Sequence, residues 1–165
     1  MRVIKVPDPF LQADGYPFRV PTRDKSGQFV PMKRDGQEVR DADGNVLVET
    51  HDGTFAEVLR TFINEVFRLA RQERLQAQAE RREAPKELTI EDSAHAVDIH
   101  RAINVIADGK LELERAPHEW LLRMIDDWGV KVLGASAAVL KEPIARAEEV
   151  EPTRAEKRRA ERAQS

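Results

Sequence analysis

Four histidines are the side chains in this chain best suited to acid–base or metal chemistry, because the sequence contains no cysteine. The lack of cysteine excludes disulfides, thiolate nucleophiles and thiolate-ligated metal sites. A catalytic or zinc site would need two or three imidazoles to converge with a carboxylate, yet His95 and His100 lie about 140° apart around a helix. We therefore predict that the histidines are hydrogen-bonded or solvent-facing. A hydrolase that uses His95 or His118 with nearby carboxylates is kept as an alternative.

An acidic run, Asp41-Ala42-Asp43-Gly44-Asn45, is the nearest approach to a metal-binding motif. With Gly44 at the sixth position of a calcium loop, Val39 would be the first ligand and Thr50 the closing carboxylate, so the register fails. Asp, Gly and Asn are instead the residues of tight turns. The run therefore predicts the turn of a β-hairpin, and we expect no metal site.

Other catalytic signatures are missing from the sequence. It contains no glycine-rich phosphate loop, no Gly-x-Ser-x-Gly and no His-Glu-x-x-His. We predict that the protein is not an enzyme and uses no cofactor.

Arginine pairs indicate a second kind of chemistry, the binding of phosphate groups. The four candidates for nucleic-acid contact are Arg81, Arg82, Arg158 and Arg159. The chain nevertheless has 27 basic and 30 acidic residues and a net charge of −3, whereas nucleic-acid-binding domains are usually basic. Contact with nucleic acid, through the C-terminal tail above all, is therefore the alternative rather than the main hypothesis.

The N-terminal segment has a composition of its own. Five of the nine prolines lie in the first 32 residues, and proline removes main-chain donors, which predicts an extended, turn-rich arm. Extended arms bind along partner surfaces and order as they bind. We predict that the arm contacts a partner through Phe10, Tyr16, Phe18 and Phe29. The alternative is that the arm wraps back onto the protein's own helices.

Helical periodicity begins at Thr54. Apolar residues from Phe55 to Ala70 follow the spacing of one helix face, and Thr54 with Glu57 matches a capping box. Polar helix formers continue to Glu83, so we expect the second half of this helix to be solvated or to await a partner.

Three further elements follow. Thr89 and Asp92 predict a second capping box, opening a helix that ends before Gly109. Residues 110–114 alternate like a short strand, and a third helix runs from Pro117 to Gly129. A small helix over 135–140 is broken by Pro143.

Together these elements predict a mainly α protein with a three- to four-helix core, an N-terminal extended arm and a small β-hairpin. We divide the chain into the arm (1–37), the hairpin (38–50), the helical core (54–142) and a charged tail, helical or disordered (143–165).

The overall composition, 41% hydrophobic and 35% charged, is typical of a soluble globular protein. No apolar run approaches the roughly 20 residues that span a bilayer, and no signal-peptide core follows the first methionine. We predict a cytoplasmic protein, in the host cytoplasm or the virion if the gene is viral.

The order of parts resembles the small accessory proteins of tailed bacteriophages, such as tail assembly chaperones. The resemblance covers roughly residues 50–142 and depends on four short segments: Asp52-Gly53-Thr54-Phe55, Thr89-Ile90-Glu91-Asp92, Leu111-Glu112-Leu113-Glu114 and His118-Glu119-Trp120-Leu121. It implies a non-catalytic role in assembly and carries over no functional residues.

From the sequence we therefore expect a protein-binding or assembly module, perhaps best described as a phage morphogenesis accessory protein, that binds another protein or its own copies and no membrane. The alternative is a small regulator that binds nucleic acid or the transcription machinery.

Overall fold

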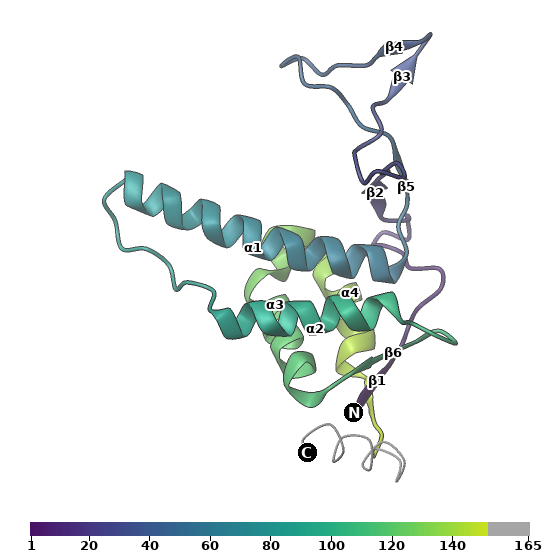
Figure 1. Cartoon of the computed structure of the whole chain (residues 1–165), viewed down its shortest axis with the longest axis vertical. Helices are drawn as coiled ribbons and strands as arrows, with labels where there is room; N and C mark the ends of the chain where they lie inside the picture. The colour runs from purple at the N-terminus through teal and green to yellow at the C-terminus, as the bar shows by residue number, and fades with distance from the viewer. Residues whose placement is uncertain (152–165) are drawn as a thin grey trace.

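The computed structural model describes residues 1–151 and shows a compact body from which a narrow stalk projects (Figure 1). The chain is mixed α/β, 47% helical and 19% strand in three small sheets, so the predicted mainly α class is wrong. The prediction failed because the proline-rich segment forms short ladders and because the two ends of the body pair as strands. We call residues 19–52 the stalk and the other described residues the body.

Helix α1 (Phe55–Ala79) begins at the predicted capping box, in which Thr54 and Glu57 each accept a hydrogen bond from the other's main chain. Its buried face runs from Phe55 to Val66 and supplies much of the core. Beyond that point most side chains are exposed, and Figure 1 shows the end of the helix extending past the body.

Helices α2 (Ile90–Asn104) and α3 (Arg115–Leu133) pack with α1 around the core. The predicted Thr89–Asp92 capping box is present at the start of α2. Gly129 was expected to close α3, but the helix continues past it to Leu133. A Cβ at Gly129 would lie 2.9 Å from the Cβ of Ala137, so glycine is needed here for close helix packing.

A 3₁₀ turn (Gly134–Ser136) leads into α4 (Ala137–Ala145), which contains Pro143 in its interior. The sequence predicted a break at this proline. The helix persists because Ile144 is fully buried and because its carbonyl accepts a 2.8 Å hydrogen bond from Nε2 of His118.

The body also contains a three-stranded antiparallel sheet in the order β6-β1-β7. Its central strand β1 (Arg2–Lys5) pairs with β6 (Lys110–Leu113) and with β7 (Glu148–Glu149). The predicted 110–114 strand is thus confirmed, but the sequence did not indicate its partners. Ile4 on β1 is fully buried, which makes the N-terminus part of the core.

The stalk contains β2 (Arg19–Pro21), β3 (Lys33–Arg34), β4 (Gln37–Glu38) and β5 (Thr50–Asp52). Strands β2 and β5 pair at its base, and β3 and β4 pair near its tip (Figure 1). A hairpin also closes at the predicted Asp41–Asn45 turn, where Arg40 pairs with Val46. The segment expected to be an irregular arm is therefore hydrogen-bonded along its length.

Candidate protein-binding stalk

The four predicted aromatic anchors separate into two pairs. Phe10 and Phe18 are buried and stack on each other with ring centroids 4.9 Å apart, and the edge of Phe10 meets Phe55. These two residues belong to the core, as the wrapped-back alternative requires. Tyr16 and Phe29 are exposed, by 68% and 48%.

The predicted phosphate-binding arginines do not form a cluster in the described residues. Arg81 and Arg82 follow the end of α1, and Arg82 pairs with Glu80 at 2.6 Å. Arg158 and Arg159 lie outside the described residues.

Three chain segments meet in a closed ring of hydrogen bonds in the lower part of the stalk. The N–H of Thr22 donates to the carbonyl of Glu49 (2.8 Å), Glu49 donates to Val30 (2.8 Å), and Val30 donates back to Thr22 (3.0 Å). We call this the lower ring. Such a ring pairs main-chain groups without a wide sheet, so a thin element gains a defined shape.

A second ring lies nearer the tip. The N–H of Met32 donates to Leu47 (2.8 Å), Leu47 donates to Val39 (2.8 Å), and Val39 donates back to Met32 (2.9 Å). We call this the upper ring. The stalk is therefore built from two rings stacked along its length rather than from one long hairpin.

The two rings are related by an internal repeat. Adding 17 to a residue number converts every bond of the lower ring into one of the upper ring, with the correspondences Thr22 to Val39, Val30 to Leu47 and, in the reverse sense, Glu49 to Met32. The pair Arg23–Phe29 likewise maps onto Arg40–Val46, while Pro31 and Val48, which pair with each other, map onto one another. Each repeat gives two members to one ring and one member to the other, as a pseudo-twofold axis at the Pro31–Val48 pair requires.

The repeat is visible in the sequence, although our sequence reasoning missed it. Both units contain Arg-Asp-x-x-Gly, at residues 23–27 and 40–44. In both, the aspartate carboxylate accepts the amides two and four residues later, and the arginine donates to the glycine carbonyl. Gly27 and Gly44 have φ of +84° and +83°, the left-handed geometry expected at the end of such a loop.

These turns use their carboxylates for internal hydrogen bonds. Side-chain hydrogen bonds from Ser26 and Asn45, together with main-chain amides, hold the pKa values of Asp24 and Asp41 below their usual range. Turn chemistry thus accounts for the acidic run considered as a calcium loop. Among residues 1–151 no group of three His, Cys, Asp or Glu side chains is placed to hold a metal ion.

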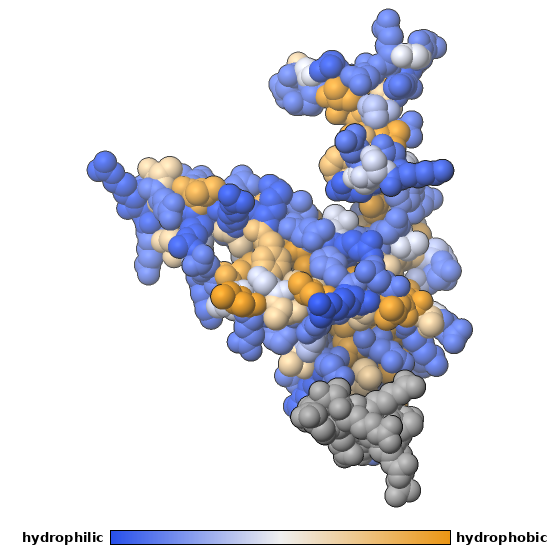
Figure 2. Space-filling view, in the orientation of Figure 1, coloured by the Kyte–Doolittle hydropathy of each residue, from blue (hydrophilic) through white to orange (hydrophobic). Residues whose placement is uncertain are grey.

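The stalk keeps apolar side chains at its surface. Phe29 is 48% exposed, and Met32 and Leu47 are each 37% exposed. Arg23 lies 3.9 Å from the centre of the Phe29 ring and covers one of its faces. Figure 2 shows apolar residues gathered along the stalk between polar turns.

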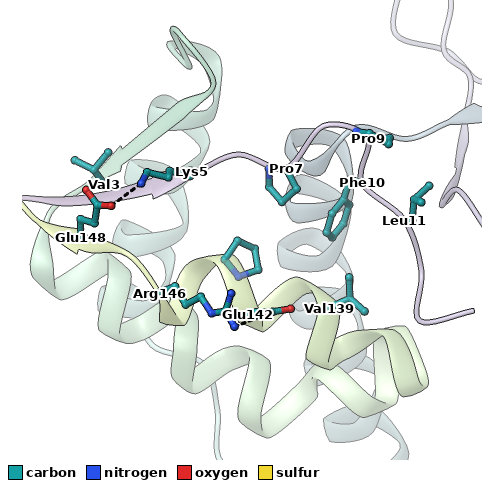
Figure 3. A pocket seen from close by; sticks show the side chains of 11 residues that line it. Val3, Lys5, Pro7, Pro9, Phe10, Leu11, Val139, Glu142, Arg146 and Glu148 are labelled. Atoms are coloured by element: carbon teal, nitrogen blue, oxygen red, sulfur yellow. Dashed lines mark hydrogen bonds and ion pairs between the residues drawn. The ribbon is translucent and has the colours of Figure 1, made fainter. Parts of the chain in front are cut away.

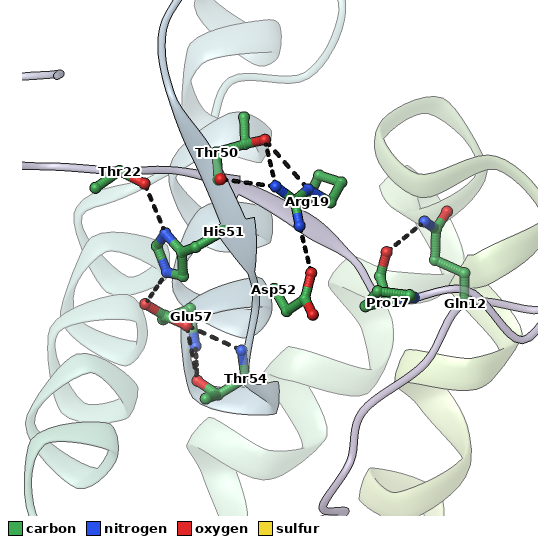
Figure 4. Close-up of polar contacts among 9 residues, drawn as sticks. All are labelled: Gln12, Pro17, Arg19, Thr22, Thr50, His51, Asp52, Thr54 and Glu57. Carbon is green, nitrogen blue, oxygen red and sulfur yellow. Dashed lines mark hydrogen bonds and ion pairs between the residues drawn. The ribbon is translucent and has the colours of Figure 1, made fainter. Parts of the chain in front are cut away.

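A polar joint connects the stalk to α1 (Figure 4). His51 lies 3.0 Å from the Thr22 hydroxyl through Nδ1 and 2.8 Å from the Glu57 carboxylate through Nε2. Burial opposes ionisation of Glu57, but hydrogen bonds from Thr54 and His51 lower its pKa below the ordinary value. A Cβ at Gly53 would come within 2.3 Å of Val20, so the stalk base also packs tightly here.

The Thr22–His51–Glu57 order resembles a hydroxyl nucleophile with its base and acid. The chemistry does not fit, because Glu57 is already the acceptor of the Thr54 cap and the main chain of Thr22 is committed to the lower ring. We interpret the group as the joint that orients the stalk relative to α1.

The remaining histidines proposed for a hydrolase also have structural contacts. His118 is buried and bonded to the Ile144 carbonyl, and the ring of His95 lies 6.2 Å from that of Trp120. His95 and His118 are not brought together with a shared carboxylate by any hydrogen bond among the described residues.

No protein-family model, curated protein or solved structure matches this chain. Within residues 1–151, no helix combines the length and apolar character needed to cross a bilayer. The functional argument therefore depends on the geometry of the molecule.

Proposed function

We propose that the protein is a non-enzymatic protein-binding module that engages a partner polypeptide through its stalk during an assembly process. The observation that carries this proposal is the exposure of Phe29, Met32 and Leu47 on strands held by closed hydrogen-bond rings. Exposed apolar side chains on a thin projecting element are typical of contact surfaces. A stalk that is already ordered also loses less entropy on binding than a disordered arm.

Within this class, we propose an accessory role in the assembly of a tailed bacteriophage. This narrower proposal depends on the sequence resemblance alone. The nucleic-acid alternative has no comparable support, since the described part of the chain holds Arg82 in an ion pair and presents both charge signs along the stalk.

The first experiment places a photoreactive amino acid at position 29 or 47 of the full chain in the cells that naturally carry the gene. A matched probe at Asp98, on the exposed surface of α2, is the control. We expect one defined polypeptide to be crosslinked from both stalk positions and not from position 98. Crosslinks to nucleic acid, or equal crosslinking from all three positions, would contradict the proposal.

The second experiment uses the purified chain and the purified crosslinked polypeptide. Phe29→Ser should weaken their affinity by about tenfold or more, as expected for an aromatic anchor. Val97→Ser removes a similarly exposed apolar side chain from the body and should leave affinity unchanged. Affinity for a random DNA duplex that exceeds affinity for the polypeptide, and falls steeply with salt, would favour the regulator alternative.

A further inference from the structure

A groove of about 590 Å³ runs between the extended segment Lys5–Leu11 and helix α4 (Figure 3). It lies on the body, away from the stalk. Its walls include Pro7, Phe10, Val139 and Pro143, with charged side chains toward the β7 end. The shape is that of a channel alongside an extended strand rather than of a round cavity.

The open edge of β1 faces this groove. Neighbouring residues of an antiparallel strand direct their main-chain N–H and C=O groups to opposite sides. Val6 donates to Gly109 on the β6 side, which assigns Ile4 to the same side and Val3 and Lys5 to the β7 side. Val3 pairs with Glu148 there, but β7 begins at that residue, and the ladder provides no partner for the main chain of Lys5.

The chain itself does not complete this edge. The residue that would follow in register opposite Lys5 is Arg146, which forms the C-terminal cap of α4, and its N–H donates to Glu142 within that helix. From Glu148 onward β7 runs toward Met1, away from the groove, as the bond from the Val150 N–H to the Met1 carbonyl shows. The edge is thus left open where an extended chain would fit.

The walls indicate the chemistry of the occupant. The charged groups neutralise each other, because Lys5 pairs with Glu148 at 2.7 Å and Arg146 pairs with Glu142 at 2.8 Å. The rest of the lining is largely proline and apolar side chains, and proline offers no N–H. An uncharged segment with apolar residues at alternate positions matches these walls and supplies its own donors.

We propose that this groove binds an extended, uncharged segment of a partner polypeptide, which continues the line of β7, runs antiparallel to β1 and pairs with the main chain of Lys5. This is strand addition, in which main-chain bonds give affinity and side-chain contacts give selectivity. The contact is separate from the stalk, so a negative result here leaves the stalk proposal intact.

The test uses the full ¹⁵N-labelled chain and a library of acetylated and amidated heptapeptides. Each has threonine at its odd positions and valine, leucine, isoleucine, phenylalanine or tyrosine at its even positions. We expect some members to shift the Lys5 amide resonance and to slow its hydrogen exchange. Methylating the central peptide nitrogen of such a binder should weaken binding by about tenfold, because it removes a ladder hydrogen bond.

A pair of valine variants tests the location. Val139→Lys places a charge in the groove wall, and Val130→Lys places one on an exposed position of α3. The first should abolish the peptide-induced shift and the second should not, with circular dichroism showing that both variants fold. The proposal is overturned if no library member shifts Lys5, if N-methylation has no effect, or if both variants bind equally. A Lys5 shift that depends on protein concentration without peptide would identify a second copy as the occupant and would also overturn it.

Discussion

At the scale of single residues, Asp92 connects two helices through one carboxylate. It accepts the Thr89 main-chain N–H at 2.6 Å, the Thr89 hydroxyl at 2.9 Å and the Trp120 indole N–H at 2.8 Å, with Arg123 at 3.2 Å. Burial opposes its ionisation, yet these donors lower the pKa of Asp92 below its usual value. The sequence predicted the capping role from the Thr89–Asp92 spacing, but not the bond to Trp120, because a contact across 28 residues leaves no periodic signal.

We predict that Asp92→Ala lowers the free energy of unfolding at pH 7 by about 2–4 kcal/mol, the sum of a lost helix cap and a buried indole N–H without its acceptor. Urea unfolding followed by tryptophan fluorescence measures it. A folded-state pKa below the unfolded one gives stability that is present above the unfolded value and is lost as pH falls through the folded value. The difference between variant and parent should therefore shrink below about pH 4. Glu91→Ala, on the exposed side of the same turn, is the control; an equal loss in both would contradict the assignment.

His100 gives a prediction of pH dependence. Burial, assisted by the positive charge of Arg60, lowers the pKa of His100 below its ordinary value. The unfolded chain then binds the proton more readily, so stability is fully present above the unfolded pKa near 6.5 and falls as pH drops below it. Urea midpoints between pH 8 and pH 5 should show this decline in the parent and a smaller decline in His100→Gln. His95→Gln retains His100 and should keep its contribution; a His100→Gln slope equal to that of the parent would refute the prediction.

At the scale of elements, the rings of the stalk lead to a prediction about amide protection. Six amides are donors in the two rings: Thr22, Val30, Met32, Val39, Leu47 and Glu49. We expect each of them to exchange with solvent at least about tenfold more slowly than the exposed amides of Lys25 and Ala42, because exchange requires the ring to open. Hydrogen exchange followed by NMR measures this. Equal rates at ring and turn positions would show that the rings are not stable in solution.

The sequence predicted elements well where local chemistry decides them. Thr54 and Thr89 each marked a helix start through a capping box that the structure contains. It failed where distant contacts decide, since α4 continues through Pro143 because His118 and a buried Ile144 stabilise its last turn. The stalk repeat lies between these cases. Its Arg-Asp-x-x-Gly signal is local and readable, but the rings join residues up to 27 positions apart.

At the scale of the whole molecule, body and stalk have separate sources of stability. The buried core cluster draws on the N-terminal residues Ile4, Phe10 and Phe18 and on the helices, and it contains no residue from 21 to 52. The sequence placed the first 37 residues in one arm because proline content does not distinguish a segment that packs on the core from one that projects. Burial of three apolar side chains in the first 18 residues makes the difference.

This separation predicts that the stalk can be excised. Pro21 and Thr50 face each other in the β2–β5 ladder, so replacing residues 22–49 with Asn-Gly should close a two-residue hairpin turn. We expect cooperative thermal unfolding with a midpoint within about 5 °C of the parent, equivalent to about 1 kcal/mol. Circular dichroism at 222 nm measures the transition.

Phe62→Ala, which empties a fully buried site in α1, is the matched control and should cost about 3–5 kcal/mol. The excised variant should also lose the partner captured from Phe29, because the contact surface is gone while the body stays folded. Loss of cooperative unfolding on excision would mean that the stalk stabilises the body, so that its exposed apolar residues would have to be explained by folding rather than by binding. Retention of the partner by a well-folded excised body would instead move the contact surface away from the stalk.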